Sequence, residues 1–362
     1  MADILTVQLR ARAFGPLRPE QFAVAEARCA PLRPGQALVE NVYLSVGAET
    51  EHTVRHDWHL HTPMPAGPAV GRVVETRTGA LPLGTVVRHD GGWSTHAVVT
   101  GGQPGLEPVE LAERLPLTFQ LSVLGRPGLA AWAGVREILR VRSEESLLVA
   151  SALSPAGHLA GQIARLYGVQ RLTAAVPAGH AAEESALSRG FDEVLDLDRP
   201  GAGSGAAAEP FDTAWTDLAG ERVPAITAML RPGARLAVLD AAGRGQAAPT
   251  GPVDSHVSVH RYRPGQHAHL RETARTWLRT QVVAKRIVPR ETVVQGFENI
   301  VDVFIDVLHG RHPDPVIVQL TGSETAPVAL REPGVVRAHA TGGDVSSLNY
   351  WIREGIAEEH NA

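Results

Sequence analysis

The stretch SLLVASALSPAGHLAGQIARLYGVQRLTAAV, residues 146–176, decides the fold of this 362-residue chain. It begins with a short apolar run, Ser146–Ser151, that is typical of a buried strand. The next segment carries apolar residues at helical spacing, among them Leu159 and Ile163, and a second apolar run follows at Arg171–Val176. A strand, a helix and a second strand in this order predict a parallel βαβ unit.

The same alternation continues along the chain. Further apolar runs predict strands at Glu193–Leu197, Asp212–Asp217, Ala234–Asp240, His256–His260 and Val316–Leu320, with helices through Leu187, at Pro224–Leu230 and at Glu298–Leu308. Strands that alternate with helices at this spacing predict an α/β fold built on a doubly wound parallel sheet.

The first 120 residues follow a different pattern. Clusters of proline and glycine separate short runs that are rich in β-branched residues or alternate apolar with polar ones. These runs predict strands at Leu5–Arg10, Phe22–Cys29, Ala37–Leu44, Ala69–Arg77 and Ser94–Val99. We expect this part of the chain to form a module that resembles a β-barrel.

The composition narrows the function. Hydrophobic residues make up 44% and charged residues 20% of the chain, the net charge is -5, and Cys29 is the only cysteine. We therefore expect no membrane, no nucleic-acid partner and no cysteine-based zinc site. The N-terminus has no basic-then-apolar signal layout, which favours a cytoplasmic protein that acts on a small molecule.

The turn after the first strand of the βαβ unit is the expected place for a dinucleotide pyrophosphate. It contains one glycine where the usual fingerprint has three. If a dinucleotide binds, its pyrophosphate should lie against Ser154, Pro155, Ala156, Gly157 and His158. An ordinary strand-to-helix turn, in which glycine serves only close packing, is the alternative.

The end of the second strand concerns the choice of cofactor. NAD enzymes usually place an acid there to bind the ribose, whereas this chain has Val176-Pro-Ala-Gly-His180. The missing carboxylate disfavours NAD and is compatible with NADP, for which His180 is the nearest candidate contact.

Several segments taken together resemble the zinc-independent medium-chain dehydrogenases/reductases, in particular the prostaglandin and leukotriene reductase branch, whose members reduce enones with NADPH. The matching segments, in the order that the family shows, are Asn41–Val46, Val70–Val74, Gly92-Trp93, Ala97–Val99, Leu124–Trp132, Gly161–Ala164, Gly190–Asp192 and Gly296–Asn299 with Phe304 and Gly310.

The resemblance implies the domain organisation. A discontinuous GroES-like barrel would span residues 1–123 and 290–335, a Rossmann domain residues 124–289, and a tail residues 336–362. The active site would lie between the two domains, no metal would be bound, and the protein would be a homodimer that takes NADP and a small-molecule substrate.

The departures from the family pattern fall on the cofactor and substrate face. In the cofactor-binding half, Ser154 replaces a glycine of the phosphate loop, Glu183 lies near the position of a lysine that binds the 2′-phosphate, and Asp240 replaces a glycine. Elsewhere, Glu49 and Glu51 replace a tyrosine and an arginine, and Asp314-Pro315 replaces Gly-Lys. A retained scaffold with altered polar positions indicates an altered chemistry.

The segment Glu49–His61 is the densest ionisable stretch of the chain. Histidine and glutamate can both transfer protons, so His56 and Glu49 are the candidate catalytic residues. The spacing of His52 and His56 would also suit a metal pair, but no matching ligand set occurs elsewhere, so we predict none. A solvated polar loop is the remaining alternative.

Five residues carry specific expectations. Asp217 stands where the family has an asparagine near the nicotinamide ribose, and Asp240 follows the next strand. Tyr262 should lie in an exposed loop beyond the strand His256–His260, where its phenol could protonate an enolate. Trp93 should pack in the barrel core, and Trp132 should open a helix and pack.

Three functions remain open from the sequence. The first is an NADPH-dependent reductase of an activated C=C or C=O bond, which fits secondary metabolism. The second is a redox-silent relative that catalyses proton transfer, addition or cyclisation, and the third is a binding protein without catalysis.

The C-terminal residues 342–362 carry an apolar stripe at helical spacing, which predicts a helix that docks on the body of the protein or on a second subunit.

Overall fold

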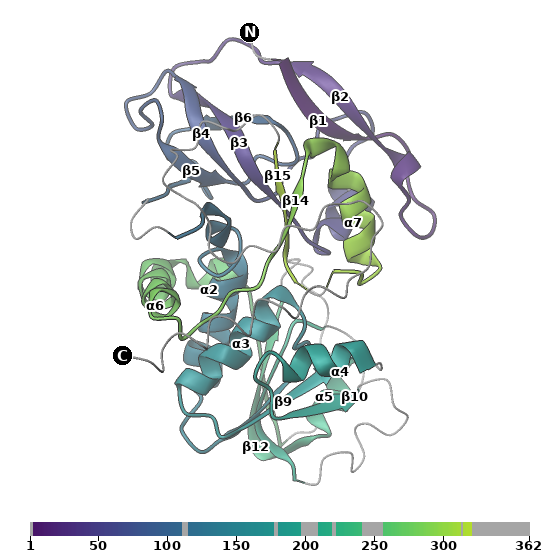
Figure 1. Cartoon of the computed structure of the whole chain (residues 1–362), viewed down its shortest axis with the longest axis vertical. Helices are drawn as coiled ribbons and strands as arrows, with labels where there is room; N and C mark the ends of the chain where they lie inside the picture. The colour runs from purple at the N-terminus through teal and green to yellow at the C-terminus, as the bar shows by residue number, and fades with distance from the viewer. Residues whose placement is uncertain are drawn as a thin grey trace, which may run out of the picture.

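The computed structural model describes residues 3–110, 115–176, 180–196, 209–218, 222–240, 256–312 and 314–320. Figure 1 shows two halves, each built around a large sheet, with helices lying where the halves meet. The predicted helix in residues 342–362 lies outside the described residues. The domain boundaries at 124 and 289 stay a prediction, although the two kinds of sheet agree with the expected fold class.

The N-terminal half contains a seven-stranded mixed sheet and a separate antiparallel pair of strands. The pair is β1 (Asp3–Leu9) and β2 (Phe22–Arg28). The sheet has the order β14 (Thr292–Gln295), β15 (Val316–Gln319), β3 (Gln36–Val46), β4 (Ala69–Thr76), β5 (Val86–His89) and β7 (Glu107–Pro108), and β6 (His96–Thr100) pairs with β3. The sequence analysis did not predict β5 or β14, two strands of four residues each.

Short helices connect the strands of this half. They are α1 (Thr50–His52), which continues as the π-helix η2 (Thr53–Asp57), the 3₁₀ turns η1 (Pro19–Gln21), η3 (Leu117–Gln120) and η6 (Phe297–Asn299), and α7 (Ile300–Leu308). The residues of α7 that face the sheet are apolar, so the helix covers the core of this half.

The other half is the predicted parallel sheet. Its strand order is β10 (Glu193–Asp196), β9 (Arg171–Val176), β8 (Ser146–Val149), β11 (Phe211–Thr216), β12 (Leu230–Leu239) and β13 (Ser258–Tyr262), all parallel. The order runs outward in both directions from the centre, as in a doubly wound sheet. Because all six strands are parallel, their carboxyl ends meet at one edge.

Helices cover this sheet and reach toward the other half (Figure 1). They are α2 (Arg126–Trp132), continued by the π-helix η4 (Ala133–Leu139), α3 (Pro155–Leu166), α4 (His180–Leu187), α5 (Arg222–Thr227), η5 (Pro264–Leu270) and α6 (Arg271–Val283). The expectation that Trp132 opens a helix was wrong, because α2 begins at Arg126 and continues past the tryptophan. Its predicted packing is confirmed by its 4% exposure.

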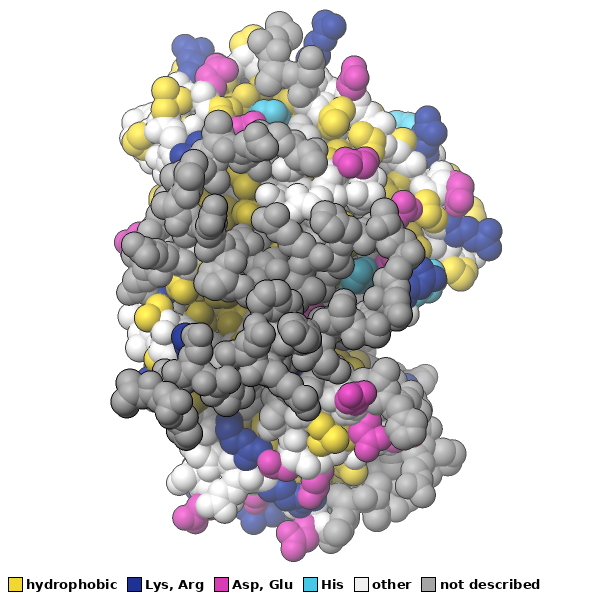
Figure 2. Space-filling model, in the orientation of Figure 1, with side chains coloured by type: hydrophobic (Ala, Val, Ile, Leu, Met, Phe, Trp, Pro, Cys, Tyr) yellow, Lys and Arg dark blue, Asp and Glu magenta, His cyan; other side chains and the backbone are white. Residues whose placement is uncertain are grey.

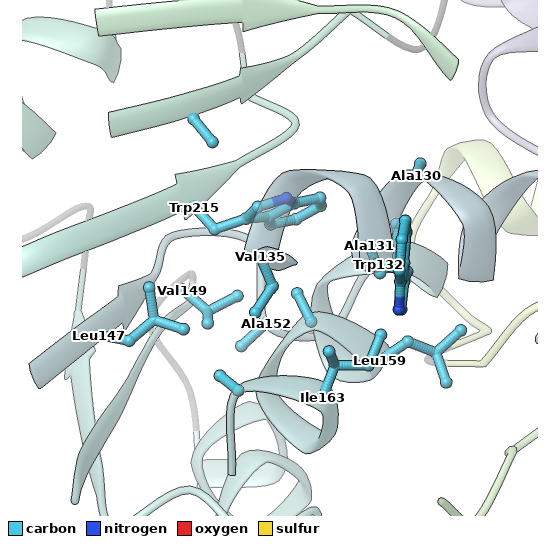
Figure 3. Packing of buried hydrophobic residues seen from close by; sticks show 14 of the residues in the cluster. Ala130, Ala131, Trp132, Val135, Leu147, Val149, Ala152, Leu159, Ile163 and Trp215 are labelled. Carbon is cyan, nitrogen blue, oxygen red and sulfur yellow. The ribbon is translucent and has the colours of Figure 1, made fainter. Parts of the chain in front are cut away.

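The two cores are packed with different side chains. The core of the mixed-sheet half joins Trp93, which is fully buried as predicted, with Trp58 and Phe304 in edge-to-face contacts. The core of the parallel half is mostly aliphatic, with many alanines, and Figure 3 shows Trp215 lying among them. Small residues let the helices approach the sheet closely.

Two glycines fix the position of α3. A Cβ at Gly157 would lie 2.0 Å from the Ser151 carbonyl oxygen, and one at Gly161 would lie 2.7 Å from the Phe191 ring. Both distances are too short for any other side chain. The sequence-based interpretation that these glycines serve close helix–strand packing is therefore confirmed.

Ion pairs join the two halves on two sides. Glu107 of β7 contacts Arg88 of β5 and also Arg271 and Arg275 of α6. Elsewhere, Arg189, whose side chain is only 1% exposed, lies 2.8 Å from Asp314 just before β15. This buried pairing directs the side chain of Arg189 to the other half.

Candidate functional site

One end of the mixed sheet faces the parallel half. The end of β3, the start of β4 and the end of β5 meet there, because the Ser45 amide bonds the Pro68 carbonyl at 2.9 Å and the Gly67 amide bonds the Asp90 carbonyl at 3.3 Å. Glu49 follows β3 and precedes α1, so its carboxylate lies at this same end.

Arg126 links this end to the parallel half. It is the first residue of α2, and its guanidinium lies 2.7 Å from the carboxylate of Asp90. The N-terminus of α2 is thereby fixed to the end of the mixed sheet, while the rest of the helix packs against α3.

Asp217 lies at the carboxyl edge of the parallel sheet, directly after β11. Its backbone N–H donates a 3.1 Å hydrogen bond to the Ser151 hydroxyl, which follows β8. Burial raises the pKa of the Asp217 carboxyl, while hydrogen bonds from the hydroxyls of Ser154 and Ser151 hold that pKa down in part. The carboxyl therefore lies beside the start of α3.

The start of α3 offers limited phosphate-binding capacity. Ser154 caps the helix and its hydroxyl accepts a 3.0 Å hydrogen bond from the Gly157 amide. Pro155 has no N–H, and the N–H groups of Gly157 and His158 bond the hydroxyl and the carbonyl of Ser154. In this first turn, the Ala156 N–H is therefore the donor that can bind a ligand. Together with the positive end of the helix dipole, these groups fit one phosphate of a dinucleotide.

Glu49 and Asp217 act on each other across the junction between the halves. Burial is the largest cause that raises the pKa of Glu49; the nearby charge of Arg126 lowers it and that of Asp217 raises it further. The Glu49 side chain reaches the surface of the protein, although other atoms of the protein lie close around its carboxyl. A carboxyl whose pKa is raised in this way is a candidate for proton transfer.

The ring of His158 does not lie at the surface of the turn. It is 1% exposed, its backbone N–H bonds the Ser154 carbonyl at 3.2 Å, and burial lowers its pKa to about 3. The expected contact between His158 and a pyrophosphate is corrected, because a helix directs this side chain into the interior. His180 begins α4, in agreement with its predicted place after β9.

The prediction of an exposed loop at Tyr262 was wrong. Tyr262 is the last residue of β13 and is 2% exposed; its hydroxyl donates to the Ala130 carbonyl and accepts from the Trp215 indole N–H, both at 2.8 Å. Burial raises the pKa of the phenol far above its ordinary value. Both bonds hold the hydroxyl inside the parallel half, so it is not poised to protonate an enolate.

Asp240 follows β12, and its carboxylate lies 2.9 Å from Arg263. His56 lies on the outer side of η2, exposed, with its ring 4.6 Å from that of His52. Within the described part of the chain, no hydrogen bond or ion pair joins His56 to Asp217 or to the start of α3. The structure thus brings Glu49, but not His56, into electrostatic contact with Asp217.

Three residues of the junction were missed by the sequence analysis: Ser151, Asp90 and Arg126. Arg126 lies inside Leu124–Trp132, the segment that carries the most specific part of the resemblance, and its charge within an otherwise apolar segment was a usable signal. Asp90 had no such signal, because its role depends on the approach of α2. Among the described residues, no group of three potential metal ligands comes together.

Comparisons with known proteins agree with this geometry. A family model described as the N-terminal domain of oxidoreductase matches residues 6–108. The chain is 28% identical to prostaglandin reductase 1 of Bos taurus over 316 residues, which cover 82% of this chain and 93% of that protein. It is 25% identical to the NADPH-dependent curcumin reductase of Escherichia coli over 343 residues, or 87% and 96% of the two chains.

The structure of CurA from Vibrio vulnificus in complex with NADPH superposes with a TM-score of 0.74 at 22% identity and covers 87% of this chain and 99% of that one. At this identity the likeness shows the shared fold. None of the described helices is long and apolar enough to cross a membrane. The motifs, the two sheets and the sequence relatives together show that this chain is similar to the zinc-independent medium-chain dehydrogenases/reductases, in particular to the prostaglandin reductases.

Proposed function

We propose that this chain is an NADPH-dependent reductase of an activated carbon–carbon double bond in a small enone. The observation that carries the proposal is the junction itself: the charge of Asp217, whose carboxyl is hydrogen-bonded by Ser154 at the start of α3, acts on the carboxyl of Glu49. The relatives support it, since their names include NADPH-dependent curcumin reductase and NADP⁺-dependent 2-alkenal reductase.

NADPH supplies a hydride when it is bound. The chain would hold one phosphate at the Ala156 N–H, where the dipole of α3 favours negative charge. Asp217 would accept a hydrogen bond from a ribose hydroxyl, in line with the family position that it occupies.

Reduction of an enone also requires a proton on the α-carbon or on the enolate oxygen. We assign this proton to the Glu49 carboxyl, because burial raises its pKa and so keeps a larger protonated fraction near neutral pH. His56 is the alternative donor, and it would have to reach the junction from the outer side of η2.

A second candidate function has an observation in its favour. The carboxylate of Asp217 shares the hydroxyls of Ser151 and Ser154 at the very turn where a phosphate would bind, and Pro155 removes one donor. Such a turn favours a redox-silent relative that uses Glu49 for proton transfer, addition or cyclisation.

Titration of the protein with NADPH and NADH separates the candidates. We expect NADPH to bind at micromolar concentration, about tenfold or more tighter than NADH. We also expect the enone 4-phenyl-3-buten-2-one to be reduced when it is mixed with the protein and NADPH. Calorimetry measures the first and loss of NADPH absorbance the second. Tighter binding of NADH would contradict the cofactor assignment, and absence of binding of either at millimolar concentration would favour the redox-silent candidate.

A further inference from the structure

A buried polar pair lies inside the mixed-sheet half. His89, the last residue of β5, is 0% exposed, and Asn41 of β3 is 1% exposed. Their side chains meet at 2.8 Å between His89 Nε2 and Asn41 Oδ1. The proposed reaction uses neither residue, so a polar pair at this depth requires an explanation of its own.

The bonds of Asn41 decide which nitrogen of the ring carries the proton. Asn41 Nδ2 donates to the Ser94 carbonyl at 2.8 Å, which leaves Oδ1 as an acceptor and makes His89 Nε2 the donor. His89 Nδ1 then accepts a 2.9 Å hydrogen bond from the Gly91 N–H. Burial lowers the pKa of the ring to about 4, so the ring is neutral near pH 7 and Nδ1 stays an acceptor.

The bond to Gly91 fixes the turn that follows β5. A Cβ at Gly91 would lie 2.7 Å from His89 Nδ1, so only glycine fits there. On the other side of the turn, the Gly92 N–H bonds the Gly67 carbonyl at 3.2 Å, and the Gly67 N–H bonds the Asp90 carbonyl at 3.3 Å. Bonds on both sides therefore hold the backbone of Asp90 in one place.

Asp90 connects this turn to the other half of the molecule. Its carboxylate lies 2.7 Å from the guanidinium of Arg126, which begins α2. The start of β4 is tied in as well, since the Pro68 carbonyl accepts a 2.9 Å hydrogen bond from the Ser45 N–H near the end of β3, ahead of Glu49. A change in the buried pair would thus reach both the start of α2 and the segment that carries the candidate proton donor.

We propose that His89 and Asn41 are positioning residues of the candidate site. They act by fixing the turn 90–92, which in turn holds Asp90 against Arg126. The turn belongs to the mixed-sheet half, whereas the start of α3 belongs to the other half, so the pair should affect turnover more than the binding of NADPH. The kinetic part of this inference rests on the proposed function, and the structural part does not.

The test compares three variants of the same histidine. His89→Leu removes both hydrogen bonds of the ring, His89→Asn keeps an acceptor at the place of Nδ1, and His89→Gln keeps a donor at the place of Nε2. His96→Leu is the matched control, because His96 lies half-buried on the neighbouring β6 and its ring bonds the adjacent Thr95 hydroxyl at 3.1 Å. Hydrogen exchange measured by mass spectrometry reports the turn, calorimetry the Kd of NADPH, and steady-state kinetics kcat and KM.

We expect amide exchange in the turn 90–92 to rise about tenfold or more in His89→Leu and His89→Gln, and less than about threefold in His89→Asn. The reason is that only His89→Asn keeps a partner for the Gly91 N–H. With NADPH and 4-phenyl-3-buten-2-one, kcat should fall about tenfold in the first two variants and recover in the third, while the Kd of NADPH changes less than about threefold in all. His96→Leu should change neither exchange in the turn nor kcat.

Unchanged exchange in the turn of His89→Leu, or a rise that is equal throughout the protein, would overturn the inference. So would an equal loss of kcat in His89→Asn and His89→Gln, or a loss of kcat matched by an equal weakening of NADPH binding. If His89→Leu does not fold, the comparison of the asparagine and glutamine variants decides the same question. If exchange in the turn responds as expected but the wild type reduces no enone, the reductase proposal fails while the positioning of the turn stands.

Discussion

The turn Ser151–Gly157 and the segment Glu49–Asp57 both border the junction, but they differ in how their groups are satisfied. In the turn, the Ser154 hydroxyl and the Gly157 amide bond each other, and Gly157 packs against a backbone carbonyl. In the segment, Val54 is buried, whereas Glu49, His56 and Asp57 are exposed. The turn is held by packing, whereas the segment carries ionisable side chains at the surface.

This difference indicates where a retained fold can accept residues that change its chemistry. Changes in the turn are limited by close contacts to the sheet, so only small side chains and a helix cap fit there. Substituted side chains in the segment would instead contact water and the opposite half of the molecule. Replacement of the family's tyrosine and arginine by Glu49 and Glu51 could therefore occur without a cost in packing.

The largest effect should come from Glu49. We expect Glu49→Gln to lower turnover about 10²–10⁴-fold without unfolding the protein, because the variant cannot supply a proton. Steady-state kinetics with NADPH and an enone, together with circular dichroism, measure this effect. Glu51→Gln, an equal loss of charge at a residue paired with Arg55, should retain activity. Equal turnover in Glu49→Gln and wild type would move the proton role to His56.

The buried ion pair between Arg189 and Asp314, which joins the two halves, should show the next largest effect, on stability. Asp314→Asn removes the charge that lies 2.8 Å from the guanidinium of Arg189, whose side chain is 1% exposed, and we expect a loss of about 3–5 kcal/mol in the free energy of unfolding. Urea denaturation measures it. Asp306→Asn, which breaks a surface pair with Arg311, should cost less than about 1 kcal/mol. Similar costs for the two variants would show that the buried pair does not hold the halves together.

Gly157→Ala tests the packing of the turn directly. The added methyl would lie 2.0 Å from the Ser151 carbonyl oxygen, so the helix must shift, at a cost of about 1–3 kcal/mol in unfolding free energy. Gly79→Ala is the control, since no atom lies within 4 Å of a Cβ at that position. If the two variants denature at the same urea concentration, the turn is less constrained than its contacts indicate.

The smallest effect is a dependence of stability on pH. The pKa of Asp217 is raised in the folded protein, so its contribution to stability is complete below the ordinary pKa of about 4 and is lost as pH rises through the folded value. Asp217→Asn should therefore gain stability relative to wild type between about pH 4 and pH 7. Urea denaturation across this range measures the difference, with exposed Glu75→Gln as control. A gain that shrinks as pH rises would contradict the burial of the carboxyl.

Much of the fold could be predicted from local pattern. The strand at Arg171–Val176 has the bounds that its apolar run predicts, and α3 begins right after the Ser154 cap. Tyr262 was misplaced because β13 extends two residues beyond the end predicted for its strand, which buries the phenol against Trp215. His158 was misassigned because a side chain in the first turn of a helix can point to the interior as readily as to a ligand.

The sequence by itself determined the alternation of strands and helices, the family resemblance and the loss of typical cofactor residues, since these depend on spacing and residue type along the chain. Only the tertiary structure decided that the charges of Arg126 and Asp217 act on Glu49, and that Arg189 pairs with Asp314. The physical reason is that each of these contacts joins segments far apart in sequence. Their distances depend on how two separately folded sheets are held against each other, which no local periodicity records.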